Sequence, residues 1–253
     1  MKNIYILYSL LICFIFQAGS GIAQSSNPQL LGIKGHNTQF AKDGKTVIYN
    51  SVTKEIRSFD IEATADRLIA GQSSLFVIDG QNVIVKDDKK EYAVSLKSGK
   101  QSSLGNKTKG ISAWHASDLR SIVIMNNGSK NVIQPIGEQD YINVSLSPDK
   151  SKIIFRATGL GSYVSDLEGN IIKEIKGAEF PSWVNDDEIV YAMIEDDGYQ
   201  YESSEIFIEN IKDNTRKELT QKTDLIPLYP SVNQNGTKLI FSTPENDVYL
   251  INL

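Results

Sequence analysis

Short apolar runs alternate with polar turns along most of the chain, and one pattern of this kind occurs four times. Each copy has an apolar residue, a turn with Asp-Gly or a related pair, and then a β-rich run; the copies span residues 40–49, 76–85, 146–155 and 232–241. Gly and Asn accept positive φ angles, so these turn pairs favour β-hairpins. Strand-rich repeats of about 30–50 residues are typical of the blades of a β-propeller.

Two weaker copies complete the series when the apolar residue before each turn is taken as an anchor. The six anchors are Phe40, Phe76, Trp114, Leu146, Trp183 and Val232. Their spacing of 32 to 49 residues predicts six small four-stranded blades, and we expect each anchor to begin the innermost strand of its blade. The third copy is the weakest, because its turn at Ser117 and Asp118 follows Trp114 with one extra residue.

The two ends of the chain predict how the blades form a closed ring. The last repeat stops at Leu253, directly after its third strand, whereas residues 29–34 form a strand ahead of the first anchor. We therefore expect the N-terminal strand to complete the last blade, so that no open strand edge remains there. The predicted fold class is all-β, a six-bladed β-propeller closed by its N-terminal strand. An open β-solenoid or a sandwich has the same strand pattern and stays an alternative.

The first residues have the pattern of a secretory signal peptide. Lys2 precedes an apolar run at residues 4–16, and small residues at Gly21 and Ala23 mark a cleavage site, so we assign residues 1–23 to the signal and 28–253 to one propeller domain. A run of about 13 residues is too short to span a bilayer as a helix. Cys13 lies in a weak lipobox-like context, which keeps a lipoprotein as an alternative. The mature chain is expected to be exported, either periplasmic or secreted.

Composition narrows the function further. Cys13 is the only cysteine, so the mature chain can form no disulfide and no thiolate metal site. Without Lys2 it carries 25 basic and 31 acidic residues, a net charge of −6, and thus lacks the basic surface of a nucleic-acid-binding protein. We expect a monomer without a membrane span after cleavage.

Residues 146–155, Leu-Ser-Pro-Asp-Lys-Ser-Lys-Ile-Ile-Phe, resemble the W-S-P-D-G-x-x-I-x-F repeat of the TolB-type β-propellers, which are related to WD-repeat propellers. Residues 180–183, Phe-Pro-Ser-Trp, match the Pro and Trp before the turn, and residues 217–220 match the outer-strand ending, whereas Asp187 replaces the family's glycine. The similarity extends over residues 30–253 and is clearest in the fourth to sixth repeats. It implies an envelope location and a ring that binds macromolecules or small ligands.

The resemblance does not carry the whole TolB role. TolB has a separate α/β domain ahead of its propeller, and only a few residues separate Ala23 from the first predicted strand here. Peptidases with related propellers need an α/β-hydrolase domain, and this sequence contains no Gly-x-Ser-x-Gly motif. The resemblance therefore implies the fold rather than translocation or peptidase activity.

His36 and His115 are the only histidines, and both lie near a predicted inner strand. They could form a metal or acid–base pair at one rim of the ring, or they could be two unrelated loop residues. One protein-bound metal needs three or more convergent ligands, and lyases on related propellers use several histidines. We therefore predict no metal site, no cofactor and no catalytic residue.

Residues 195–202, Glu-Asp-Asp-Gly-Tyr-Gln-Tyr-Glu, form the longest predicted loop between a second and a third strand. Tyr199 and Tyr201, with Tyr229 from the neighbouring loop, could form an aromatic platform beside Asp196 and Asp197. Tyrosine combines apolar area with a hydroxyl group, which suits recognition of a protein or a sugar. The alternative is a solvated insertion, and the acidic residues lack the spacing of an EF-hand calcium loop.

These observations predict an exported, non-catalytic binding protein that recognises an envelope protein or a glycan, and no nucleic acid, through one loop face. The predicted contact residues are His36, His115, Asp196, Asp197, Tyr199, Tyr201 and Tyr229. The alternative function is a polysaccharide lyase or hydrolase that uses carboxylates near the channel mouth, since one fold hosts many functions.

Overall fold

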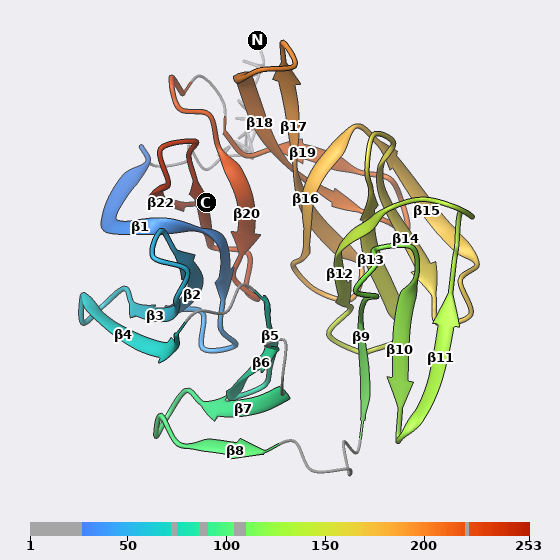
Figure 1. The fold of residues 1–253 in the computed structure, drawn as a ribbon. Helices are drawn as coiled ribbons and strands as arrows, with labels where there is room; N and C mark the ends of the chain where they lie inside the picture. Colours follow the sequence, from blue (N-terminus) through green and yellow to red (C-terminus); the bar gives the residue numbers. More distant parts are fainter. Residues whose placement is uncertain (1–26, 72–74, 87–90, 104–109, 221–222) are drawn as a thin grey trace, which may run out of the picture.

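A computed structural model describes residues 27–71, 75–86, 91–103, 110–220 and 223–253, and its regular elements are all β-strands. The predicted signal peptide, with Cys13, lies outside these residues. No helix within the described ranges has the length and apolar character needed to cross a bilayer. The strands form antiparallel sheets that lie side by side around a common centre (Figure 1).

Four sheets consist of strands that follow one another in the chain. The first two sheets contain β5 (Leu75–Asp79), β6 (Asn82–Lys86), β7 (Glu91–Ser95) and β8 (Gln101–Ser103), and then β9 (Ile111–His115), β10 (Ile122–Asn126) and β11 (Ser129–Ile133). The other two contain β12 (Tyr141–Leu146), β13 (Lys152–Ala157), β14 (Gly161–Asp166) and β15 (Ile171–Lys176), and then β16 (Ala178–Trp183), β17 (Glu188–Asp196), β18 (Tyr201–Asn210) and β19 (Arg216–Glu218).

The remaining sheet joins the two ends of the chain. Its seven strands, in sheet order, are β20 (Leu228–Val232), β21 (Lys238–Ser242), β22 (Asp247–Asn252), β1 (Gln29–Phe40), β2 (Thr46–Ser51), β3 (Ile56–Asp60) and β4 (Ala65–Ala70). The first part of β1 pairs with β22, where Gln29 lies opposite Leu250, and its second part pairs with β2, where Gly35 lies opposite Ser51. The first strand of the domain thus lies beside the last (Figure 1).

Buried apolar side chains fill the space between neighbouring sheets. On β13, Ile153 packs toward the β9–β11 sheet, whereas the adjacent Ile154 packs toward the β16–β19 sheet. Both side chains are fully buried. A strand covered on both faces needs apolar residues at consecutive positions, which explains the continuous apolar runs of the second strands. Full burial of one such side chain stabilises the fold by roughly 1.5–3 kcal/mol.

Four anchors end their inner strands, where we had expected them to begin these strands. Phe40, Leu146, Trp183 and Val232 are the last residues of β1, β12, β16 and β20. The inner strands extend upstream of the anchors through polar and apolar residues, such as Asn143, Val144 and Ser145 in β12. Residues just upstream of the anchors border the centre of the molecule.

The third repeat has no extra residue. The amide N–H of Ala116 donates to the carbonyl of Ser121, as Ala41 donates to Thr46 and Ser147 donates to Lys152. The hydrogen bonds therefore place His115, rather than Trp114, at the anchor position. A histidine at an apolar position explains why the sequence pattern gave the wrong register here.

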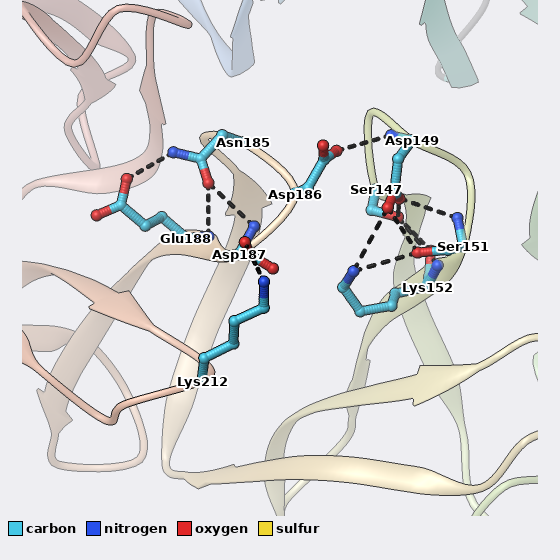
Figure 2. Close-up of polar contacts among 9 residues, drawn as sticks. All are labelled: Ser147, Asp149, Ser151, Lys152, Asn185, Asp186, Asp187, Glu188 and Lys212. Carbon is cyan, nitrogen blue, oxygen red and sulfur yellow. Dashed lines mark hydrogen bonds and ion pairs between the residues drawn. The ribbon is translucent and has the colours of Figure 1, made fainter.

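Acidic side chains take part in the turns that follow Leu146 and Trp183 (Figure 2). Asp149 accepts hydrogen bonds from the Ser147 hydroxyl (2.6 Å) and the Ser151 amide (3.0 Å), and these donors lower the pKa of its carboxyl group. The Asp186 carboxylate accepts a bond of 2.7 Å from the Asp149 amide and so links two neighbouring sheets. Asp187 forms an ion pair with Lys212. The acidic residues at 186–188 are therefore turn and contact residues.

Candidate functional site

A cavity of about 370 Å³ lies at the centre of the molecule, bordered by β1, β5, β9, β12, β16 and β20. These six inner strands belong to five sheets: β5, β9, β12, β16 and β20 each lie at the edge of a sheet, and β1 lies within the seven-stranded sheet. The aromatic residues that line the cavity are Phe76, Trp114, Phe180 and Tyr229, and the amides and hydroxyls come from Asn37, Thr38, Gln39, Asn143, Ser145 and Ser182. A concave site with apolar walls and a few polar groups is the usual form of a small-ligand site.

Four of the six inner strands carry the same β-bulge. In β1, β12, β16 and β20 the register shifts at one residue with φ of 50–52°, and these residues are Asn37, Asn143, Phe180 and Tyr229. Each lies three positions before the anchor of its strand. Asn tolerates this backbone region, whereas an aromatic residue there costs about 1–3 kcal/mol. The inner strands β5 and β9 pair with their neighbours without a shift.

The two strained aromatic residues meet at the cavity. The ring centroids of Phe180 and Tyr229 are 3.9 Å apart, and the His36 ring lies 5.8 Å from that of Tyr229. Burial raises the pKa of the Tyr229 phenol, and the nearby phenol of Tyr201 raises it further. Burial lowers the pKa of His36 and so favours its neutral form. His36, Tyr201 and Tyr229 thus share one neighbourhood.

An ion pair between Arg156 on β13 and Glu179 on β16 lies beside these rings. Burial raises the pKa of Glu179, the contact with Arg156 lowers it, and the carboxylate of Asp196 raises it again. Arg156 also influences the pKa of Tyr229, so the ion pair and the ring pair are close to each other. Within the described chain, the buried Nε of Arg156 has no hydrogen-bond partner. We call His36, Arg156, Glu179, Phe180 and Tyr229 the mouth cluster.

The predicted loop at 195–202 is largely a β-hairpin. Strands β17 and β18 pair as far as Asp196 and Tyr201, and only residues 197–200 form the turn. The hairpin projects from its sheet (Figure 1), and its tip carries Tyr199, which is 98% exposed, near Tyr201, which is 41% exposed. We call residues 196–201 the tyrosine hairpin.

The two aspartates of the tyrosine hairpin bind its own backbone. Asp197 accepts bonds of 2.8 Å from the amides of Gln200 and Tyr199, and these donors lower the pKa of its carboxyl group. Asp196 accepts a bond of 2.9 Å from the Gly198 amide. Both carboxylates therefore stabilise the turn that presents Tyr199.

The two histidines occupy different ends of their strands. His36 lies near the start of the part of β1 that pairs with β2, whereas His115 is the last residue of β9. His115 borders the cavity, and its Nδ1 is 3.1 Å from the carbonyl oxygen of Ala116. In the ranges that the structure describes, no three His, Cys, Asp or Glu side chains are grouped to hold a metal ion.

The sequence reasoning identified Tyr229, His36 and His115 but missed the other residues around the cavity. Arg156 and Glu179 lie in strands, and no role in binding was predicted for them from the sequence. Asn143 and Phe180 were likewise not among the predicted contact residues. A signal was present, because residues 180–183 and 229–232 both have an aromatic residue, Pro, Ser and an apolar anchor in sequence. Alignment of the repeats on their anchors would have placed all four bulge residues in one column.

Comparison with solved structures identifies the architecture. A putative TolB from Agrobacterium tumefaciens matches with a TM-score of 0.55 and 15% identity, over 87% of this chain and 90% of that one. The β-propeller domain of Cps50 (Swd1) from Myceliophteria thermophila matches with a TM-score of 0.53 and 9% identity, over 90% and 99%. The fold is a β-propeller. The prediction of an all-β propeller is thus confirmed.

A third propeller-sized structure, a calcium-binding regucalcin from Agrobacterium tumefaciens, matches with a TM-score of 0.56 and 12% identity, over 89% of this chain and 92% of that one. No protein-family model matches the sequence, and no curated protein is significantly similar to it. Identities this low establish a common fold and leave function to be argued from the site itself.

Proposed function

We propose that this chain is an exported, non-catalytic binding protein, a TolB-type six-bladed propeller that recognises an envelope protein or glycan through one loop face. That face carries the tyrosine hairpin and the mouth cluster. The observation that carries the proposal is the exposed pair Tyr199 and Tyr201 on a projecting hairpin, with Tyr201 close enough to influence the pKa of Tyr229 beside the cavity. Exposed tyrosines are enriched where proteins bind partners.

Two observations support the six-bladed, closed form of the ring. Six inner strands border one cavity, and each begins a sheet or the equivalent part of the seven-stranded sheet. The first part of β1 pairs with β22, as a fourth strand of the last blade would, and an ion pair of 2.8 Å between Lys34 and Asp247 accompanies this pairing. Closure gives the loop face a rigid support.

The positions of the acidic groups favour binding over the alternative of a polysaccharide lyase or hydrolase. Such an enzyme needs carboxylates that face the substrate as acid, base or nucleophile. Asp196 and Asp197 accept hydrogen bonds within their own turn, and Glu179 is paired with Arg156. The side chains on the loop face are instead suited to contact a partner.

The test is capture of partners from envelope extract by the purified mature chain, followed by direct binding of each identified partner. We expect Tyr199→Ala with Tyr201→Ala to weaken that binding about tenfold or more, because such anchors contribute over 1 kcal/mol each. Leu68→Ala is the control, since Leu68 is exposed on β4. A partner bound equally by the double variant, or turnover of a polysaccharide panel that Asp197→Ala abolishes, would refute the proposal.

A further inference from the structure

The size and lining of the central cavity indicate the class of ligand it takes. A volume of about 370 Å³ is near the lower end of small-molecule sites, which are roughly 300–1,000 Å³. It suits a small compound or the end of a longer one. Apart from the titratable His115, the described residues that line it are uncharged. A charged ligand group would lose its hydration there, and the two charges of the mouth cluster, Arg156 and Glu179, already pair with each other, so the cavity favours a neutral ligand.

Some polar lining groups serve the fold, and others do not. Thr38 donates to the carbonyl of Tyr229, and Asn37 bonds to Asn50 and Gln39. By contrast, the side chains of Asn143, Ser145 and Ser182 border the cavity without a hydrogen bond to any described residue. These three groups come from the adjacent strands β12 and β16, so they lie in one part of the wall.

Aromatic rings border the same cavity. Phe180 and Tyr229 form a close ring pair, and Trp114 lines the wall on β9. The backbone strain at Phe180 and Tyr229 is a cost to stability that functional sites commonly carry. A ligand that fits this lining has an apolar ring face to lie on an aromatic ring and several hydroxyl or amide groups to bond Asn143 and Ser182.

We propose that the cavity binds a neutral sugar ring, the end unit of a glycan. This inference rests on the proposed binding function and selects glycan over protein as the partner. The ring takes its place against the aromatic wall, and its hydroxyl groups exchange hydrogen bonds with Asn143, Ser145 and Ser182. The following units of the glycan leave through the mouth cluster toward Tyr201 on the tyrosine hairpin.

Tryptophan fluorescence tests the proposal, because Trp114 lines the cavity and the only other tryptophan, Trp183, donates to the carbonyl of Ser145 nearby. The mature chain is titrated with glucose, galactose, mannose, N-acetylglucosamine and their disaccharides, with galacturonate and glucosamine as charged counterparts. We expect a saturable change with at least one neutral sugar and binding of its charged counterpart at least tenfold weaker.

Two variants locate the binding site. Asn143→Gly removes the amide while glycine accepts the φ of 52°, and Ser182→Ala removes the hydroxyl. Each should weaken sugar binding about tenfold, the effect of one lost hydrogen bond of roughly 1.4 kcal/mol. Asn214→Gly, at an exposed outer turn with φ of 61°, is the matched control and should bind normally.

The inference is overturned if no neutral sugar in the panel gives a saturable response, if charged sugars bind equally well, or if both variants bind normally. It also fails if the captured partner is a protein that depends on Tyr199 and Tyr201. In that last case the proposed binding function stands while the sugar site falls, so the two failures are distinguishable.

Discussion

The bulge residues show how single positions shape the centre of this propeller. Asn37, Asn143, Phe180 and Tyr229 share one backbone conformation, and each is followed by a residue that does not pair in register. In two of the four strands that next residue is a proline, Pro181 or Pro230. Proline has no amide hydrogen to donate to a neighbouring strand, so it is tolerated at a bulge, where the regular pairing is interrupted. The bulges turn polar and aromatic groups toward the cavity.

Asp149 gives a prediction for pH dependence. Hydrogen bonds from Ser147 and Ser151 hold its pKa below the ordinary value of 3.8, so its contribution to stability is present above that value and is lost as the pH falls below it. Asp149→Asn should lower the free energy of unfolding by about 1 kcal/mol at pH 7, since the side chain is partly exposed. Thermal unfolding should show a melting temperature lower by about 2–4 °C.

The difference between wild type and Asp149→Asn should shrink when both are measured near pH 3. Asp224→Asn is the control, because this exposed side chain accepts no hydrogen bond from the rest of the described chain. A difference that is the same at pH 7 and pH 3 would contradict the assigned role of the Asp149 carboxylate.

At the scale of strands, β1 has the most demanding geometry, because it passes from β22 to β2. Gly35 lies at this crossing, and its amide donates to the carbonyl of Asn246 (2.7 Å). A Cβ atom at Gly35 would lie 2.3 Å from the carbonyl oxygen of Asn50 and 2.5 Å from the Tyr49 ring. No other residue type fits there without moving the backbone of β2.

Gly35→Ala should therefore destabilise the protein by about 2–3 kcal/mol, the usual cost of overpacking a tight site. Gly71→Ala is the matched control, because a Cβ at Gly71 meets no atom within 4 Å, and this change should be neutral or slightly stabilising. Urea unfolding of the two variants measures the difference. Equal midpoints would contradict the close contact at the crossing.

The elements could be predicted from the sequence where apolar pattern and turn chemistry coincide. The continuous apolar run at 153–155 and the turn at Asp149 gave correct strands and turns. The register of the third repeat was wrong, because His115 occupies an apolar position. The hairpin at 195–202 was predicted as a loop, because its residues are mostly polar. In the structure, cross-strand pairing between β17 and β18 supports these polar residues as strands.

The candidate site was harder to predict than the fold. Tyr229 was found because it is aromatic and lies in a long connection, whereas Asn143 and Ser182 are common residue types in short strands. Their importance arises only when six strands from distant parts of the chain converge. Sequence periodicity describes each strand separately and contains no information on which residues meet at the centre.

For the whole molecule, the pairing of β1 with β22 joins the first and last strands of the described chain. In a chain of residues 24–253, which begins at the proposed cleavage site, deletion of residues 24–34 removes this pairing and uncovers Val248 and Leu250, which lie in one apolar cluster with Ile33 and Leu31. Loss of the buried Ile33 side chain and the partly buried Leu31 side chain costs about 2–4 kcal/mol. We expect the melting temperature to fall by about 10 °C and the chain to self-associate through the free edge of β22.

Deletion of residues 24–28 alone, which precede β1, is the control and should leave both properties unchanged. Differential scanning calorimetry and size-exclusion chromatography measure the two outcomes. A monomeric 35–253 chain with the melting temperature of the 24–253 chain would show that the first part of β1 does not stabilise the fold.

The neighbouring positions of Gln29 and Leu250 also impose an order of events on biogenesis. A polypeptide leaves the ribosome, or a translocation pore, with its amino end first, so half of β1 must wait while some two hundred residues follow it. Until the final strand is delivered, that segment has no permanent neighbour and is available to chaperones and proteases. The native topology is therefore completed only after β22 has emerged, and a chain that stops before β22 leaves the first part of β1 unpaired.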